Sequence, residues 1–384
     1  MPAILLLLMA AHFLVDTMGA LISPLWPNLE KSVGVNTRTM LWIFVVWNTT
    51  TSFSQLLFAY LGTRFRNRWF LWGGPAVACI CMSCVGLVSS PVAMTLLLIA
   101  GGLGVAAFHP EAATAVGEIA PGHRSRVMSL FILGGFTGHA VSPYYSGLVT
   151  DTFALPGLAL TIAWGLPCVG LVAFGLRKLP AASEPATPEA PSAAASGTGS
   201  HRHRGIILVL VIQTLRNVPM MGVPIILAYL LEARGYATAQ VGLVQTFFLA
   251  GIGAGGLICA VVGRQEYELP ILRGVPLVLA PLVVVIPYVD GIRIHVCVAL
   301  TGAMLGIALP VMISFGQQVM PHGKRIASSL TLGVSWGFSG AFVAPLFLLK
   351  ESGRWDVAFL VFAGTSIVSG LLAFRLPRLS GPVE

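Results

Sequence analysis

Long apolar stretches separated by short polar ones run through the whole chain. A helix needs about 20 apolar residues to cross a hydrocarbon core about 30 Å thick. Twelve runs of about this length are found, over residues 3–29, 39–61, 69–89, 92–119, 124–150, 156–176, 205–231, 239–262, 269–289, 293–319, 326–349 and 355–375. The runs are continuous and do not alternate in polarity as the strands of a transmembrane barrel do. The pattern predicts an all-α membrane protein with twelve transmembrane helices.

The longest polar interruption, residues 180–204, is rich in Pro, Ala, Ser and Gly. Such a segment cannot form a core, so it predicts a flexible linker between two six-helix bundles, residues 1–179 and 205–384. The halves resemble each other at an offset of 200 to 202 residues. Five residues of the first half have a similar residue at this offset in the second half: Gly104 and Gly306, Pro121 and Pro321, Arg124 and Lys324, Gly138 and Gly340, and Pro143 and Pro345. A duplicated unit predicts a binding site between the halves near the middle of the membrane.

Composition and charge agree with this picture. The chain is 56% hydrophobic and 9% charged, whereas soluble proteins are about 25% charged. Most lysines and arginines lie in loops that share one side of the membrane when both termini are cytoplasmic. The net charge of +8 therefore reflects membrane topology and does not indicate a nucleic-acid partner. We predict a multi-pass protein of the cytoplasmic (inner) membrane with both termini in the cytoplasm.

Three runs contribute candidate ionisable side chains that lie deep inside them. Residues 102–113, GLGVAAFHPEAA, place His109, Pro110 and Glu111 in an otherwise apolar run. Ionisable residues at such depth are costly and usually face a cavity on an ion or proton path. Pro110 has no N–H for the preceding turn, so we expect a kink or a moving part there. His109 and Glu111 would project about 200° apart in a regular helix, and we favour Glu111 as the inward residue.

The first run contributes His12 and Asp16, which lie four residues apart and so share a helix face. Counting helical rise places them in one layer with His109, Glu111 and Arg216. Arg216 needs a counter-charge, and Asp16 and Glu111 are the acids at its depth. We predict that Asp16, Glu111, His109 and His12 couple transport to protons. A fixed ion pair, neutral hydrogen-bonding histidines and a metal-ligand set remain alternatives, although the spacing of these residues matches no recognisable metal motif.

The six-plus-six organisation resembles the major facilitator superfamily of secondary transporters. The loop AYLGTRFRNRWFL, residues 59–71, is similar to its signature loop at Gly62, Arg64 and Arg68, but Thr63 stands where the signature has Asp. GGFTGHAVSPYYSG, residues 134–147, is similar to a fifth-helix motif of antiporters and contains Gly134, Gly138 and Pro143. The resemblance implies gating or structural roles for these residues, and we predict such roles also for Pro110, from its place within a helix, and for Pro345, from its equivalence to Pro143.

Within the superfamily, FHPEAA (residues 108–113) and HFLVDTM (residues 12–18), with Pro24, Trp26 and Pro27, resemble the fosmidomycin resistance protein family. That resemblance implies a proton-coupled exporter of a drug-like or anionic metabolite substrate. We expect a monomer without cofactor or metal whose partners are substrate, protons and the lipid bilayer.

Further polar residues within the spans are candidates for contacting substrate: Arg216, Gln213, Asn217, Asn48, Gln55, Gln245, Gln317 and Trp336. The sequence has no phosphate-binding loop, GxSxG elbow or zinc-protease helix, so we expect no enzyme and no ATPase. Energy must then come from a gradient. Alternatives to export are an importer or uniporter on the same fold, a metal-ion exporter and a non-transporting membrane sensor.

Overall fold

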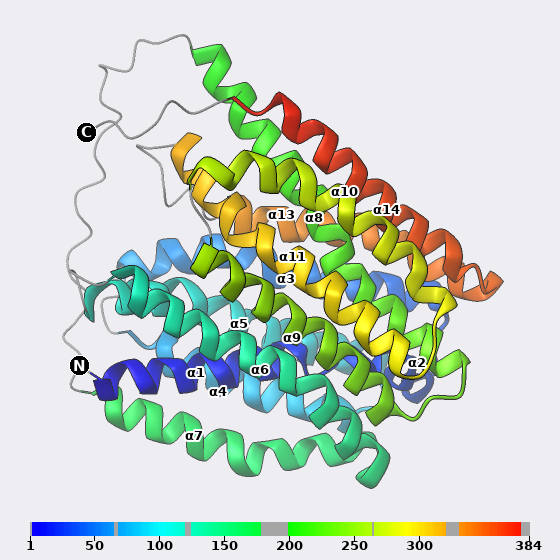
Figure 1. Ribbon diagram of the computed structural model, residues 1–384. Helices are drawn as coiled ribbons and strands as arrows, with labels where there is room; N and C mark the ends of the chain where they lie inside the picture. Colours follow the sequence, from blue (N-terminus) through cyan, green and yellow to red (C-terminus); the bar gives the residue numbers. More distant parts are fainter. Residues whose placement is uncertain are drawn as a thin grey trace.

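The computed structural model describes residues 2–64, 68–119, 124–177, 199–262, 265–319 and 330–377, and all regular structure in these ranges is helical. The first half contains α1 (Pro2–Ala20), α2 (Trp26–Val33), α3 (Thr37–Arg64), α4 (Phe70–Cys84), α5 (Pro91–Ile119), α6 (Arg124–Phe153) and α7 (Thr161–Leu176) (Figure 1). The second half contains α8 (Gly199–Ala233), α9 (Thr238–Val262), α10 (Glu268–Val285), α11 (Ile292–Val319), α13 (Ser335–Val343) and α14 (Trp355–Leu372).

Short segments of tighter helix extend or join these elements, at Ser23–Leu25, Val85–Leu87, Leu155–Leu160, Gln265–Tyr267, Ile286–Tyr288, Ala344–Ser352 and Ala373–Arg375. A π-helical turn, Leu330–Val334, precedes α13. Nine of the described helical segments are long and apolar enough to cross a membrane by length and composition alone. Each of the twelve predicted runs coincides with helix in the described residues, so the predicted all-helical membrane fold is confirmed.

Two boundaries differ from the prediction. The first run is not one helix, because α1 ends at Ala20 and α2 starts at Trp26. Pro24 has no N–H for the carbonyl of Ala20, and proline is favoured at helix starts, so the chain breaks and restarts there. Residues 199–204, predicted to belong to the linker, are the first turns of α8. Residues 180–198, the rest of the predicted linker, lie outside the described residues, as do residues 178 and 179.

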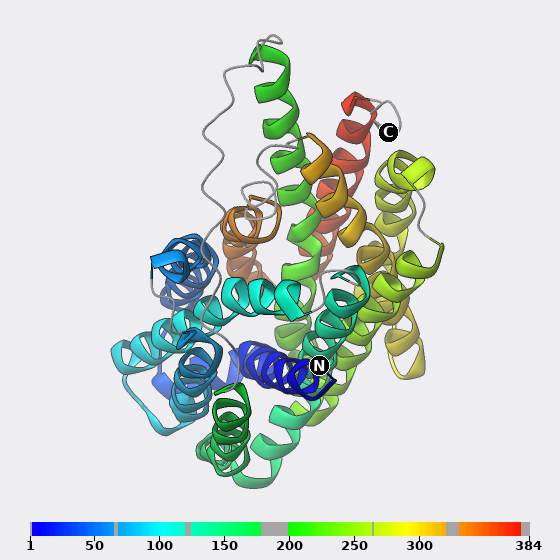
Figure 2. The same cartoon turned by 90° about the vertical axis from the view of Figure 1, so that its left-hand side faces the viewer.

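The helices run roughly along one direction, and the two halves lie side by side (Figures 1 and 2). The start of α1, the end of α7 and the start of α8 lie on one side, here called the terminal face. The side where α2 ends and α9 begins is called the distal face. Helix α6 packs against α9, and α3 packs against α13, along the boundary between the halves.

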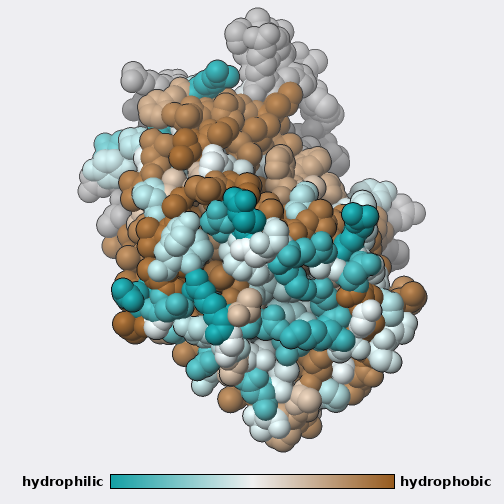
Figure 3. All heavy atoms as spheres, turned by 90° about the vertical axis from the view of Figure 1, so that its right-hand side faces the viewer, coloured by the Kyte–Doolittle hydropathy of each residue, from teal (hydrophilic) through white to brown (hydrophobic). Residues whose placement is uncertain are grey.

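The halves are held together at the distal face. Lys350 Nζ donates to Glu30 Oε1 at 2.7 Å, and Lys31 pairs with Glu232. The carboxylate of Asp151, at the end of α6, accepts hydrogen bonds from the backbone N–H groups of the first residues of α9, Thr238 at 3.1 Å and Ala239 at 2.8 Å. Hydrophilic side chains form a band across this face, and side chains fill its centre (Figure 3).

Glycines allow α6 and α9 to approach closely near the same face. A Cβ added to Gly242 would collide with the backbone of Pro143, and one added to Gly147 would collide with the backbone at Thr238. Because these contacts are backbone against backbone, no side-chain rotation can relieve them. The distal face is therefore closed by charge pairs, a shared helix cap and tight helix packing.

A cavity of about 830 Å³ lies between the halves. Its lining runs from Ser23 and Trp26, next to the break between α1 and α2, to Met128 in the second turn of α6 and Ala260 in the last turn of α9. Since α6 begins and α9 ends at the terminal face, the cavity reaches that face.

Candidate substrate and ion site

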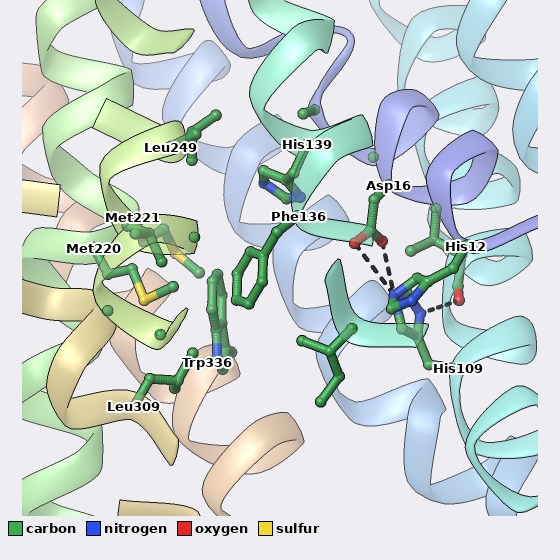
Figure 4. A pocket seen from close by; sticks show the side chains of 18 of the residues that line it. His12, Asp16, His109, Phe136, His139, Met220, Met221, Leu249, Leu309 and Trp336 are labelled. Atoms are coloured by element: carbon green, nitrogen blue, oxygen red, sulfur yellow. Dashed lines mark hydrogen bonds and ion pairs between the residues drawn. The ribbon is translucent and has the colours of Figure 1, made fainter. Parts of the chain in front are cut away.

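Three titratable side chains meet on one wall of the cavity (Figure 4). His12 Nε2 lies 3.3 Å from Asp16 Oδ2, and His109 Nε2 lies 3.1 Å from Asp16 Oδ1. His12 and Asp16 come from successive turns of α1, as their spacing predicts, and His109 comes from α5. The carboxylate is thus bracketed by two imidazoles, and these three residues are called the His–Asp–His cluster below.

Backbone carbonyls fix the orientation of both imidazoles. His12 Nδ1 lies 2.9 Å from the carbonyl oxygen of Phe131, and His109 Nδ1 lies 2.8 Å from that of Val105. A carbonyl oxygen only accepts hydrogen bonds, so each Nδ1 must carry a hydrogen and donate it. Each Nε2 is then left to face Asp16.

Proton counting follows from this geometry. With Asp16 ionised and both histidines neutral, lone pairs on each Nε2 face lone pairs on the carboxylate. One added proton turns one of the two Nε2–oxygen contacts into a hydrogen bond, and a second proton does the same for the other contact. Two protons satisfy both contacts, and they change the net charge of the cluster from −1 to +1.

The cluster depends on the glycines of α6. Cβ atoms added to Gly134 and Gly138 would meet the α1 backbone at Met9 and Phe13, and one added to Gly135 would meet His12 and Asp16. Because these glycines have no side chains, α6 lies directly on α1. This contact brings the Phe131 carbonyl to His12 and stacks the Phe131 and His12 rings with 4.1 Å between their centroids. Gly134 and Gly138, predicted as structural residues, thus lie in this interface.

Of the polar residues predicted to contact substrate, Asn48, Gln55 and Trp336 line the cavity. Asn48 comes from α3 and donates from Nδ2 to Met221 Sδ of α8 at 3.4 Å, across the boundary between the halves. Trp336 projects from α13 toward Phe136 of α6 (Figure 4).

The other predicted substrate contacts lie behind the wall. Arg216 is 5% exposed, does not belong to the lining, and donates from Nη1 to the Ala308 carbonyl at 3.1 Å and to Gln213 Oε1 at 3.3 Å. No carboxylate of the described residues lies within ion-pair distance of it, so the expected pairing with Asp16 or Glu111 is not present.

Four predicted amides, Gln213, Asn217, Gln245 and Gln317, also stand outside the lining. Gln213 donates to Asn217 Oδ1 at 3.2 Å, and Asn217 donates to Ser335 Oγ at 3.0 Å, so both are bound within the second half. Gln245 donates to the carbonyls of Ser23 at 3.2 Å and Pro224 at 2.7 Å, so it links the second half to the first next to the break between α1 and α2. Gln317 is half-buried on α11 and has a partner.

The expectation that Glu111 faces inward is wrong. His109 lines the cavity, whereas Glu111 is 6% exposed and lies against Gly62 of α3, where an added Cβ would stand 2.9 Å from Glu111 Oε2. Helix α5 passes through Pro110 without interruption, so the two residues keep the opposite directions of a regular helix. Arg68 and Glu118 lie within electrostatic range of the Glu111 carboxylate.

The remaining predicted structural residues are distributed over both faces. Arg68 pairs with Glu118 toward the terminal face, and its backbone has a φ of 51°. The side chain of Arg64 lies outside the described residues. Pro143 belongs to the α6–α9 contact at the distal face, and Pro345 opens the tight helix Ala344–Ser352 with its ring exposed.

Several lining residues were missed by sequence reasoning. His139 of α6 and Glu268 of α10 belong to the lining, as do Met220 and Met221 of α8. His139 lies within a predicted span, so the rule that intramembrane ionisable residues mark functional sites would have identified it. No comparable signal distinguishes a cavity-lining methionine from one that packs in the core.

The ligand atoms of the His–Asp–His cluster lie within 4.8 Å of one another. This spacing is compatible with a cation of some kind between them. The Nε2–oxygen separations of 3.1 and 3.3 Å are hydrogen-bond distances, which favours shared protons.

Comparison with known proteins settles the family. The family model of the Major Facilitator Superfamily matches residues 8–345. The chain belongs to this superfamily. It is therefore a multi-pass membrane transporter and not an enzyme.

Two relatives and one solved structure illustrate the similarity. The chain is 21% identical over 390 residues to the fosmidomycin resistance protein of Escherichia coli (strain K12), covering 96% of this chain and 91% of the relative. It is 23% identical over 392 residues to an uncharacterised MFS-type transporter, YfnC, of Bacillus subtilis (strain 168), covering 97% and 92%. The inward-open xylose transporter XylE of E. coli matches with a TM-score of 0.75 at 14% identity, covering 98% of this chain and 97% of XylE.

Proposed function

We propose that this transporter is a proton-coupled exporter of small drug-like molecules and that the His–Asp–His cluster is its proton site. The observation that carries the proposal is the pair of oriented imidazoles on one buried carboxylate at the wall of the cavity. Histidine is the side chain whose ordinary pKa, about 6.5, lies near physiological pH. A carboxylate between two of them is a group that takes up and releases protons as its surroundings change.

The proposed cycle uses the two halves, residues 1–179 and 205–384, as rocking units, with both termini in the cytoplasm. The described conformation then opens its cavity to the cytoplasm and is closed at the distal face. Substrate enters from the cytoplasm while the cluster is deprotonated. After the halves rock, protons bind to the cluster from outside, the substrate leaves, and the return step delivers the protons to the cytoplasm.

Export is favoured over import by the relative named for resistance to fosmidomycin, since a transporter that protects a cell from a compound does so by carrying it out. This support concerns direction only. The number of protons in the proposed cycle is two, one for each Nε2–oxygen contact of the cluster.

The test is transport by the purified monomer in proteoliposomes with an imposed pH gradient. Asp356→Asn, at an exposed ion pair with Arg354, is the matched control for loss of a carboxylate. A panel containing lipophilic cations, neutral drugs and the phosphonate fosmidomycin should contain a compound that moves against its gradient when protons flow. Asp16→Asn should lose this movement and Asp356→Asn should keep it. Normal proton-driven transport by Asp16→Asn would disprove the proposal.

A further inference from the structure

The charge of the cavity wall is biased toward one sign. Among the described residues, the lining holds two carboxylates, Asp16 and Glu268, and neither lysine nor arginine. The buried cation Arg216 is outside the lining, and its guanidinium donates to the Ala308 carbonyl and Gln213. An anion entering this cavity would meet carboxylates and no fixed cation on its wall.

Besides neutral polar residues such as Asn48 and Gln55, the wall is largely apolar and aromatic and contains several methionines. Trp26, Trp47 and Trp336 line it together with Phe44 and Phe136. Tryptophan faces attract cations, and the attraction strengthens when the cation is desolvated. Four methionines, Met82, Met128, Met220 and Met221, add polarisable side chains that adapt to ligands of different shape. A volume of about 830 Å³ accommodates a drug-sized molecule with several rings.

The titratable groups around Asp16 determine how such a ligand would respond to protons. His12 faces it from α1 and His109 from α5, and His139 of α6 is within electrostatic range. Helices α4 and α7 also pack against α1, and cysteines are their only titratable side chains. The deprotonated cluster carries a charge of −1 and the doubly protonated cluster +1, by the proton count above.

This change of sign relates the substrate's charge to the type of coupling. A cationic substrate is attracted by the deprotonated cluster and repelled by the protonated one, so it competes with protons, as exchange across the membrane requires. An anionic substrate would be attracted by the protonated cluster and would travel with protons in the same direction. Proton exchange and an anionic substrate are therefore inconsistent at this site.

We propose that the cavity selects lipophilic cations, such as protonated amines and quaternary onium ions with aromatic groups, over anions of the same size. This inference rests on the proposed function and names its substrate class. It departs from the expectation of an anionic metabolite.

The experiment uses two ions of matched shape and opposite charge, tetraphenylphosphonium and tetraphenylborate. Binding to the purified full-length protein in nanodiscs is followed by tryptophan fluorescence at pH 8 and pH 5.5, with protein-free nanodiscs as blanks. We expect tetraphenylphosphonium to bind at least tenfold more tightly than tetraphenylborate at pH 8, to weaken at pH 5.5, and to release protons into a weakly buffered solution. Equal or tighter binding of tetraphenylborate or fosmidomycin, or proton uptake on cation binding, would overturn the proposal.

Two variants test whether Asp16 produces the preference for cations over anions. Asp16→Asn should lower the affinity for tetraphenylphosphonium by tenfold or more and leave tetraphenylborate unchanged or tighter, whereas the surface variant Asp356→Asn should bind both like the parent. An Asp16→Asn protein that is folded and keeps full cation preference would assign the selectivity elsewhere and refute the role given to the cluster. Because binding needs no gradient, cation selectivity without proton-driven transport would count against the proposed function alone. Proton-driven transport of an anion would count against the substrate class alone.

Discussion

The first helices of the two halves carry opposite charges at equivalent positions. Asp16 of α1 and Arg216 of α8 are 200 residues apart, the offset that relates the halves. The backbone of each first helix accepts a hydrogen bond from a serine of a neighbouring helix: Ser142 of α6 donates to the Thr17 carbonyl at 2.5 Å, and Ser339 of α13 donates to the Thr214 carbonyl at 2.8 Å. Packing is similar on the two sides, but the chemistry is not.

Asp16 faces the cavity and its partners are titratable, whereas Arg216 lies behind the wall and its partners are a carbonyl and an amide. A carboxylate between histidines changes charge with pH. An arginine keeps its charge at any physiological pH. We infer from this comparison that the proton chemistry of the first helices belongs to the first half, whereas the second half supplies a fixed charge behind the wall, the Glu268 carboxylate and the adaptable methionines Met220 and Met221.

The largest effect on transport is expected when the titratable carboxylate of the first half, Asp16, is replaced. Asp16→Asn keeps the size of the side chain and cannot ionise, so both imidazoles lose the charge they share. Proton-driven flux should fall by about tenfold or more, the change that about 1.4 kcal/mol produces. Flux measured beside equilibrium exchange at equal pH separates lost coupling from lost folding. Retained coupling would show that the two halves do not differ as described.

Replacing either histidine of the cluster should change the number of protons transported per substrate. His109→Gln keeps a hydrogen-bond donor toward Asp16 but cannot gain a proton, and His12→Gln acts likewise on the other oxygen. Either variant should reduce the coupling ratio from two protons to one per substrate. The gradient of substrate sustained at a known pH gradient measures this ratio. An unchanged ratio in both variants would refute the proton count.

Arg216 tests the other side of the comparison. Arg216→Ala removes a buried guanidinium and leaves the Ala308 carbonyl and Gln213 without this donor, which costs about 1–3 kcal/mol. We expect a lower melting temperature in detergent and an unchanged preference between cation and anion in the variant that remains folded. Arg216→Lys should recover part of the stability, because its ammonium keeps a charged donor for these two acceptors but lacks the planar fork of the guanidinium. A reversal of charge preference would place Arg216 in the binding site.

A smaller effect is expected at the distal closure, where one half caps a helix of the other. Asp151→Ala removes the carboxylate that accepts hydrogen bonds from the first N–H groups of α9, and loss of such an N-cap interaction costs about 1 kcal/mol. The population open to the terminal face should fall about fivefold relative to the other state, since 1.4 kcal/mol corresponds to a factor of ten. Accessibility of a cysteine introduced at Gln55 on the cavity wall measures this shift. Accessibility equal to that of the parent would show that the cap does not stabilise this conformation.

The sequence predicted the helical fold because an apolar run of about 20 residues has few alternatives in a bilayer. It also predicted that His12, Asp16 and His109 share a layer. It could not predict which of His109 and Glu111 faces inward, because that depends on rotation of α5 about its axis. Close packing sets the rotation: a Cβ at Gly104 would collide with the α4 backbone at Gly74. The partner of Arg216 was missed for a related reason, since a backbone carbonyl leaves no signature in the sequence.

The smallest effect is expected at Glu111, although sequence reasoning gave this residue the leading role. Its carboxylate lies outside the cavity lining, against α3 and near Arg68 and Glu118. The equivalent position in the second half, 200 residues later, is the buried Val311, so a titratable group is not part of the shared architecture.

Glu111→Gln keeps the shape and most hydrogen bonding, so proton-driven flux should change by less than about threefold, which corresponds to under about 0.7 kcal/mol. The measurement is the same paired assay of gradient-driven flux and equilibrium exchange, with Asp16→Asn beside it. If Glu111→Gln loses gradient-driven flux and Asp16→Asn does not, the proton path runs along the α3–α5 contact. The contrast between the first helices of the two halves would then have no part in coupling.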